Sequence, residues 1–295
     1  MTSNRPSSEP QSDLVRIFVE RSGVPVIDCS PERVMARIVE RMRCGRVRNQ
    51  EQRLQRALKE RNVVSVDFTP NLKCDGMLEP IGQTFADGFK VQLKKNVSAA
   101  RMRFSVAHEI CHTFFYELVP EMKFRDHDVD EAEERLCNFG AAELLVPDKS
   151  LRASARKLPI CLGSLEQLAE NYCVSLPTML IRLRALGLWD CELSNWHRDV
   201  NGGFVLDSLY GGRRLEWEWQ DSSQLQRAWE SSKPIFGTGF VYLADSRGRE
   251  RYKPISYNLR RSGSGVIALW GVGIRKAAQN HPLFDLGLRR VALTG

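Results

Sequence analysis

The stretch RFSVAHEICHTFFYE, residues 103–117, constrains the fold more than any other part of the sequence. Apolar residues surround a polar triplet made of His108, Glu109 and His112, and the pattern has helical spacing from Ala99 onward. Two of the chain's five histidines therefore lie four residues apart on one face of a helix that is apolar enough to be buried. Because buried polar side chains need partners, this helix is expected to pack where another group supplies them.

The triplet has the spacing of an HExxH motif. Two imidazoles at positions i and i+4 bind one zinc ion at about 2.0–2.1 Å, and the glutamate beside the first histidine takes a proton from a water that the metal activates. This pattern indicates His108 and His112 as metal ligands and Glu109 as a general base. The alternative is a chance match on an ordinary core helix, and the scarcity of histidine argues against it.

A catalytic zinc site needs a third protein ligand and one open position. The candidates downstream are His127, Asp130, Glu131, Glu133, Glu134 and Glu143. A second helix, predicted over 129–145, would place Glu134 on one face with Asn138 and Ala141, and the small alanine would allow close approach to the first helix. Periodicity alone does not exclude Glu133, so two neighbouring carboxylates remain open at this point.

Other nearby groups fit a ligand role less well. Glu131 has Arg135 at i+4 and is expected to be solvated. His127 lies in a charged loop and is expected at the surface. Cys111 points about 100° away from His112 on the helix, which disfavours it as a fourth, site-closing ligand.

Two segments resemble the ImmA/IrrE family of bacterial metallopeptidases. RMRFSVAHEICHTFFYE (101–117) is similar to the family's HExxH helix, and EERLCNFGAAELLVP (133–147) is similar to its following helix of the form E-x-x-A-N-x-F-A-x-x-L-L-x-P. The resemblance places Glu134 on the family's third zinc ligand, ahead of Glu133. Cys137 and Gly140 stand where the family usually has alanine and phenylalanine, and both departures concern packing.

The resemblance implies an activity and a substrate class. It implies a zinc-dependent endopeptidase, with Zn²⁺ or Mn²⁺ as the metal. The implied substrate is a narrow one, a helix-turn-helix repressor of the XRE type, whose cleavage would derepress stress-response or mobile-element genes. The stretch around 74–96 also resembles the family, and the strand at 88–95 is expected beside the cleft, where an extended peptide could add to its edge.

The fold class expected is α+β, beginning with a zincin-like metallopeptidase domain over 13–150 that holds a small antiparallel sheet. Residues 1–12 are polar, lack the apolar core of a signal peptide and are expected to be a disordered lead-in. The remaining elements of the domain follow from periodicity and turn signals. Helices are predicted at 31–43 and 49–60, strands at 63–68 and 88–95, and a loop at 71–83.

A helix-turn-helix segment is predicted over 151–189, with its helix pair at 164–187. The second helix would expose Thr178, Arg182 and Arg184, which are few basic groups for a DNA reader. This favours a packing or substrate-docking role over direct DNA binding.

The last predicted domain covers 190–295 and is a β-rich α+β domain with a helix near 222–231. Family relatives of this kind carry a sensor-like module at this place, which suggests a sensing or interaction role. Its tryptophans are expected in the core: Trp196, Trp217, Trp219, Trp229 and Trp270. His197 and His281 are expected at the surface or in structural roles.

Composition bounds the setting of the chain. Eight scattered cysteines without a CxxC pair fit reduced thiols and a cytoplasmic protein. No apolar run reaches the roughly 18 residues of a membrane helix, so no membrane partner is expected. The net charge of +7 leaves a second hypothesis open, a non-catalytic DNA- or protein-binding regulator with a structural metal site.

Overall fold

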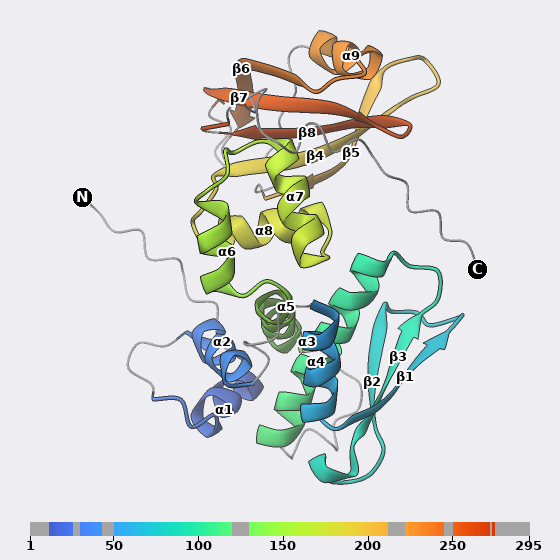
Figure 1. Cartoon of the computed structure of the whole chain (residues 1–295), viewed down its shortest axis with the longest axis vertical. Coiled ribbons are helices and arrows are strands. Elements are labelled where there is room, and N and C mark those ends of the chain that lie inside the picture. The colour runs from blue at the N-terminus through green and yellow to red at the C-terminus, as the bar shows by residue number, and fades with distance from the viewer. Residues whose placement is uncertain are drawn as a thin grey trace. The chain divides into compact units, whose positions relative to one another are not determined.

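The computed structural model describes residues 12–25, 30–42, 50–119, 130–211, 222–244, 250–271 and 273–274. The chain divides into two compact units, Met1–Ser150 with Tyr172–Ser175 and Leu151–Asn171 with Leu176–Gly295. Helices and strands occur in both units, so the chain has a mixed α+β fold (Figure 1). None of the described helices has the length and apolar character needed to cross a membrane.

The first unit contains five helices within the described ranges. They are α1 (Asp13–Arg21), α2 (Pro31–Arg41), α3 (Gln50–Glu60), α4 (Ala99–Leu118) and α5 (Glu131–Leu145). Four of them begin at a side chain that accepts a hydrogen bond from a backbone amide of the first turn. These caps are Ser12, Ser30, Ser98 and Asp130. The helices predicted at 31–43, 49–60, 99–117 and 129–145 therefore form within two residues of their expected ends.

A three-stranded sheet packs against α4. Its strands are β1 (Val63–Thr69), β2 (Gly76–Pro80) and β3 (Phe89–Lys94), in the order β1-β3-β2. The expectation of an antiparallel sheet is wrong, because β1 runs parallel to β3 and only β2 is antiparallel to it. The reason is topological: β2 lies on the far side of β3, so the chain reverses twice before β3 pairs with β1.

Two further expectations about this sheet need correction. The segment 71–83 is not all loop, since Gly76–Pro80 forms β2. The strand at 88–95 offers no free edge, since β3 has a partner on each side. Its alternation is as predicted, with Phe89, Val91 and Leu93 buried. β2 was missed because it is only five residues long, and its alternation of apolar and polar residues is too weak to predict a strand.

Helix α4 is the centre of the first unit. It contacts α1, α3 and α5 as well as β2, β3 and the 3-10 helix η2 (Phe85–Asp87). Gly140 of α5 faces α4, because a Cβ at this position would lie 2.7 Å from Cys111 Sγ and 3.0 Å from a side-chain carbon of Met35 in α2. The lack of a side chain at Gly140 is what lets three helices meet there.

The second unit combines α7 (Leu162–Tyr172), α8 (Leu176–Ala185) and α9 (Ser222–Glu230) with a five-stranded antiparallel sheet, and α6 (Asp148–Ala155) leads into it. The sheet order is β5-β4-β8-β7-β6. The strands are β4 (Cys191–Arg198), β5 (Phe204–Tyr210), β6 (Ile235–Ala244), β7 (Glu250–Ser262) and β8 (Gly265–Gly271). Neither α6 nor β4 was predicted from the sequence.

Helices cover both faces of this sheet (Figure 1). On one face, Leu225 and Ala228 of α9 pack in a core with Tyr257 and Trp270. Asn258 has the opposite parity in β7, and its Oδ1 accepts a hydrogen bond from the Leu162 amide of α7. The sheet is therefore the middle layer of the second unit.

One expectation about α8 is wrong. Arg182 was expected to be exposed, but it is 1% exposed, and burial lowers its pKa to about 10. Arg184 is engaged as well, since its Nη1 donates to the Cys191 carbonyl at 2.7 Å. Arg182 lies between Met179, Leu180 and Leu183 in sequence, and tertiary packing places all four in the interior. Arg182 and Arg184, the basic residues that a DNA-binding α8 would present to DNA, are thus engaged within the protein.

The tryptophan expectations hold where the structure describes them. Trp196 and Trp270 are buried, and Trp229 packs against the same core. His197 is partly exposed and pairs with Asp207. The predictions for residues 1–11, Trp217, Trp219 and His281 lie outside the described residues.

Gly140→Ala tests the helix contact. We expect a loss of about 1–3 kcal/mol in unfolding free energy, because the new methyl group overlaps Cys111 and Met35. Gly163→Ala is the matched control, since nothing lies within 4 Å of a Cβ there and alanine favours a helix. Urea unfolding of both variants measures the difference, and equal midpoints would contradict the tight contact.

Candidate metal centre

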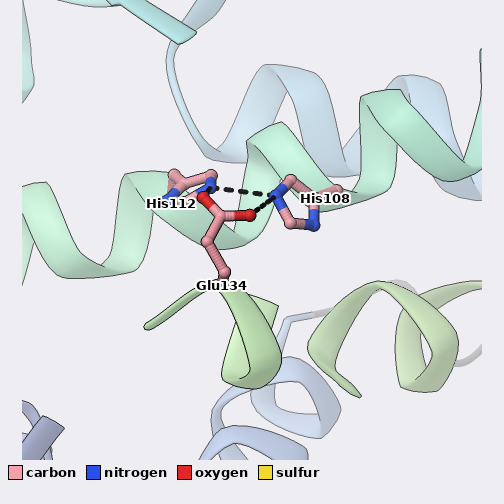
Figure 2. A group of neighbouring side chains, drawn as sticks. All are labelled: His108, His112 and Glu134. Carbon is pink, nitrogen blue, oxygen red and sulfur yellow. Dashed lines mark hydrogen bonds and ion pairs between the residues drawn. The ribbon is translucent and has the colours of Figure 1, made fainter. Parts of the chain in front are cut away.

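Three side chains from two helices converge beside the HExxH segment. His108 and His112 project from the same face of α4, and Glu134 reaches them from the first turn of α5 (Figure 2). The two histidine Nε2 atoms are 3.0 Å apart. Glu134 Oε2 lies 3.2 Å from His108 Nε2, and Glu134 Oε1 lies 3.3 Å from His112 Nε2.

These separations suit a single tetrahedral metal ion. Donor atoms that each lie about 2.0–2.1 Å from a tetrahedral zinc are about 3.3 Å from one another. The two Nε2 atoms are 3.0 Å apart, and each has one oxygen of Glu134 at 3.2 or 3.3 Å, so the three side chains are close enough to share one ion. The donor set of two imidazoles and one carboxylate is also one that binds zinc and leaves a fourth position for chemistry. The residues present therefore fit a divalent metal.

Glu133, the other open carboxylate, occupies a different place. Its Oε1 lies 2.6 Å from His112 Nδ1, on the side of the ring opposite the cluster. With Cys137 these residues form a second close group, His112, Glu133 and Cys137. A separation of 2.6 Å is a hydrogen bond rather than the spacing of two ligands, and burial raises the pKa of the Cys137 thiol to about 11. The second group is thus better explained by hydrogen bonding than by metal binding.

The cluster holds one carboxylate ionised and one imidazole protonated. Hydrogen bonds from His108 and then His112 hold the pKa of Glu134 well below its usual value. Burial alone would lower the pKa of His112, but Cys137, Glu133 and Glu134 outweigh it and raise that pKa well above the ordinary value. The ionised Glu134 therefore lies against two imidazoles that are only 12% and 14% exposed, and a metal would bind there in exchange for the extra proton of His112.

Glu109 lies beside the cluster and is 5% exposed. Burial raises its pKa, and His112 and His108 oppose that rise. Its Oε1 would be 2.7 Å from a Cβ at Gly76, so only glycine allows β2 to come this close. The backbone of Leu78 also hydrogen-bonds to it. A carboxyl group whose pKa is raised in this way is suited to accept and return a proton near neutral pH.

The direction of the Leu78 amide follows from the strand register. Asp75 accepts from the Lys94 amide, and the Ile81 amide donates to Gly88, so odd-numbered residues of this strand face β3. Leu78 therefore points its backbone groups away from β3, toward the free edge of β2. Among the described residues no strand pairs with this side of β2, and Glu109 hydrogen-bonds to the Leu78 backbone there.

The other sequence candidates have different surroundings. Asp130 caps α5 by accepting from the amides of Ala132 and Glu133. Glu131 is 89% exposed at its side chain and pairs with Arg135, as expected. Glu143 accepts from the Asp148 amide. His127 lies outside the described residues.

Three other side chains near the motif have other surroundings. Tyr116 packs edge-on against Phe89, and burial raises its pKa. Arg103 pairs with Glu51. Cys111 is fully buried and is not among the grouped ligands.

Sequence reasoning missed three features of the site: the contact of Glu133 with His112, the proximity of Cys137, and the role of Gly76. The Asp75-Gly76 pair was visible only as a turn signal. The packing that places Gly76 against Glu109 depends on β2, which the sequence did not reveal. These features involve residues far apart in sequence, which local periodicity does not connect.

Comparison with known proteins places part of the chain in a family. The family described as "Peptidase_M78: IrrE N-terminal-like domain" matches residues 87–184, which run from η2 to α8. This segment belongs to the ImmA/IrrE family. The match confirms the resemblance seen in the two motif helices, and it supports a metallopeptidase with a metal ion.

Two further comparisons add little. No curated protein gave a match. A solved structure described as "Mycobacterium tuberculosis transcriptional regulator" is 13% identical with a TM-score of 0.44, covering 87% of this chain and 78% of that one. A likeness at this level carries no argument about fold or function.

Metal titration tests the cluster. We expect one equivalent of Zn²⁺ to bind and to raise the melting temperature, because a ligand of the folded state alone stabilises it. His108→Ala and Glu134→Ala should each abolish this shift. His197→Ala is the control, since His197 is a partly exposed histidine in the second unit. An unchanged shift in Glu134→Ala would exclude Glu134 as a ligand.

Proposed function

We propose that this chain is a zinc-dependent endopeptidase that cleaves a protein substrate. His108, His112 and Glu134 are the metal ligands, Glu109 is the general base, and Mn²⁺ is an alternative metal. The observation that carries the proposal is the cluster in Figure 2 together with the buried carboxyl of Glu109 beside it. Membership of residues 87–184 in the ImmA/IrrE family supports the same reading.

Each of these residues has a distinct role in the proposed mechanism. The three ligands would hold zinc, which when bound polarises a carbonyl and lowers the pKa of water. Glu109 accepts a proton from the attacking water and then donates it to the leaving amine. The Leu78 backbone orients the Glu109 carboxyl through its hydrogen bond. Burial of Glu109 limits solvation of the charged form, which suits this proton exchange.

The substrate is proposed to bind as an extended strand along β2. In the part of the chain that the structure describes, β2 is the edge strand on the side of Glu109, because β3 is paired on both sides. Pro80 lies at the end of β2 and has no amide hydrogen. Sheets tolerate proline at an edge strand, where no partner needs that hydrogen. Because the Leu78 amide already donates to Glu109, a peptide segment added to this edge would use other outward-facing main-chain groups of β2 and pass beside the base.

The finer identity of the substrate follows the family resemblance. We propose a transcriptional repressor of the XRE helix-turn-helix type, cleaved in the cytoplasm to derepress stress-response or mobile-element genes. The zincin-like domain would cover 13–150, the helix-turn-helix segment 151–189 would dock or pack, and 190–295 would sense or interact. Incubation of the purified protein with candidate repressors, with and without Zn²⁺, tests this by mass spectrometry of fragments.

Glu109→Gln should lower the rate of cleavage by about 10²–10⁴-fold, because the amide cannot accept the proton. Zn²⁺ affinity should stay close to that of the parent, since Glu109 is not a ligand in this assignment. Glu131→Gln is the control, because its side chain is 89% exposed on α5. Fragment yield over time reports the rate, and undiminished cleavage by Glu109→Gln would exclude the proposed base.

Gly76→Ala should lower cleavage on the order of 10²-fold, because its Cβ would overlap Glu109 Oε1 and displace either the base or the edge strand. Zn²⁺ binding should persist, which separates this effect from loss of the metal site. Gly163→Ala, where the added methyl meets open space, is the control. Full activity in Gly76→Ala would show that the close approach of β2 to Glu109 is not needed.

A further inference from the structure

We propose that Glu133 is a positioning residue, whose buried carboxylate holds His112 in the tautomer that presents Nε2 to the metal. The inference rests on the proposed function in one respect, the assignment of His112 as a ligand. It assigns to Glu133 a role distinct from that of Glu134, although the two are adjacent in sequence.

Both ring nitrogens of His112 are engaged. Nδ1 lies 2.6 Å from Glu133 Oε1, and Nε2 faces His108 and Glu134 at 3.0 and 3.3 Å. A neutral imidazole has one N–H and one lone pair, and an ionised carboxylate can only accept. When His112 is neutral, as metal binding requires, Glu133 therefore keeps the proton on Nδ1 and leaves the lone pair of Nε2 pointing into the cluster. A carboxylate in this position is a common way to orient a metal-binding histidine.

The burial of Glu133 is not explained by its place in the helix. Acidic residues in a first turn interact favourably with the helix dipole, but Glu131 and Glu134 share that turn and remain 89% and 39% exposed at their side chains. The Glu133 side chain is only 6% exposed. Burying a carboxylate is costly unless it is paired, and its hydrogen-bonding partner is His112. The hydrogen bond to His112 therefore explains why the Glu133 side chain is buried.

The hydrogen-bonding partners at Nδ1 differ between the two histidines. His108 Nδ1 lies 3.1 Å from Asn138 Oδ1, a neutral amide at an exposed position. An amide side chain can present either its oxygen or its NH₂ group, so it selects the tautomer less strongly than a carboxylate does. The carboxylate on His112 is the charged and shorter contact. Loss of Glu133 should therefore weaken metal binding more than loss of Asn138.

Zn²⁺ affinity of Glu133→Gln, measured by competition with a chromophoric chelator, tests the proposal. We expect affinity to fall about 10–100-fold. Glu131→Gln is the matched control, with the same chemical change in the same helical turn, and it should bind as the parent does. Asn138→Leu should show a smaller loss. Melting of the metal-stripped proteins is measured in parallel, and we expect Glu133→Gln to match the parent there.

Each result has a defined meaning. Affinity of Glu133→Gln equal to that of Glu131→Gln overturns the positioning role but leaves the proposed function standing. A loss as large as that of Glu134→Gln also overturns it, because Glu133 would then be a ligand. A parent protein that binds no Zn²⁺ overturns both. If Glu133→Gln fails to fold, Glu133→Asp is compared with Glu131→Asp, and unchanged affinity again overturns the positioning role.

Discussion

The close approach of α5 to α4 is the contact on which the rest of the site depends. Gly140 permits it, because a side chain there would overlap Cys111 and Met35. The approach brings the first turn of α5 to the histidines of α4, so that Glu134 reaches both Nε2 atoms. The positions of side chains from two helices relative to one another depend on the distance between the helices. Here Gly140, which has no Cβ, allows the short distance.

Adjacent carboxylates acquire different roles from this geometry. Glu133 and Glu134 are about 100° apart around α5, so one faces the outer side of His112 and the other faces the metal cluster. Glu109, on α4, is held instead by burial and by the edge strand β2. Three acidic side chains thus surround the same pair of imidazoles, and their different burial and contacts support the three roles proposed for them: an orienting group, a ligand and a base.

In the second unit, helices α7 and α8 take part in packing, which differs from the DNA-binding role that a helix-turn-helix can have. These helices lie in the same compact unit as the five-stranded sheet, and α7 is joined to β7 by the Leu162–Asn258 hydrogen bond. Arg182 is buried and Arg184 bonds to a backbone carbonyl, so the basic residues of α8 serve the interior of the fold. This weighs against the DNA-reading hypothesis and suits a role for α7 and α8 in packing.

The sequence by itself determined helices α2 to α5 of the first unit, the HExxH triplet and the family to which residues 87–184 belong, whereas α1 was not predicted. These are local properties, since helical periodicity, capping residues and the i, i+4 spacing all act within a few turns. The tertiary structure decided which carboxylate faces the Nε2 atoms of both histidines, that β3 is the central strand and β2 an edge strand of the described sheet, and that Arg182 is buried. Each of these depends on which distant segments pack together, because a side chain's partners across a helix pair or sheet are set by the packing of whole elements and not by its neighbours along the chain.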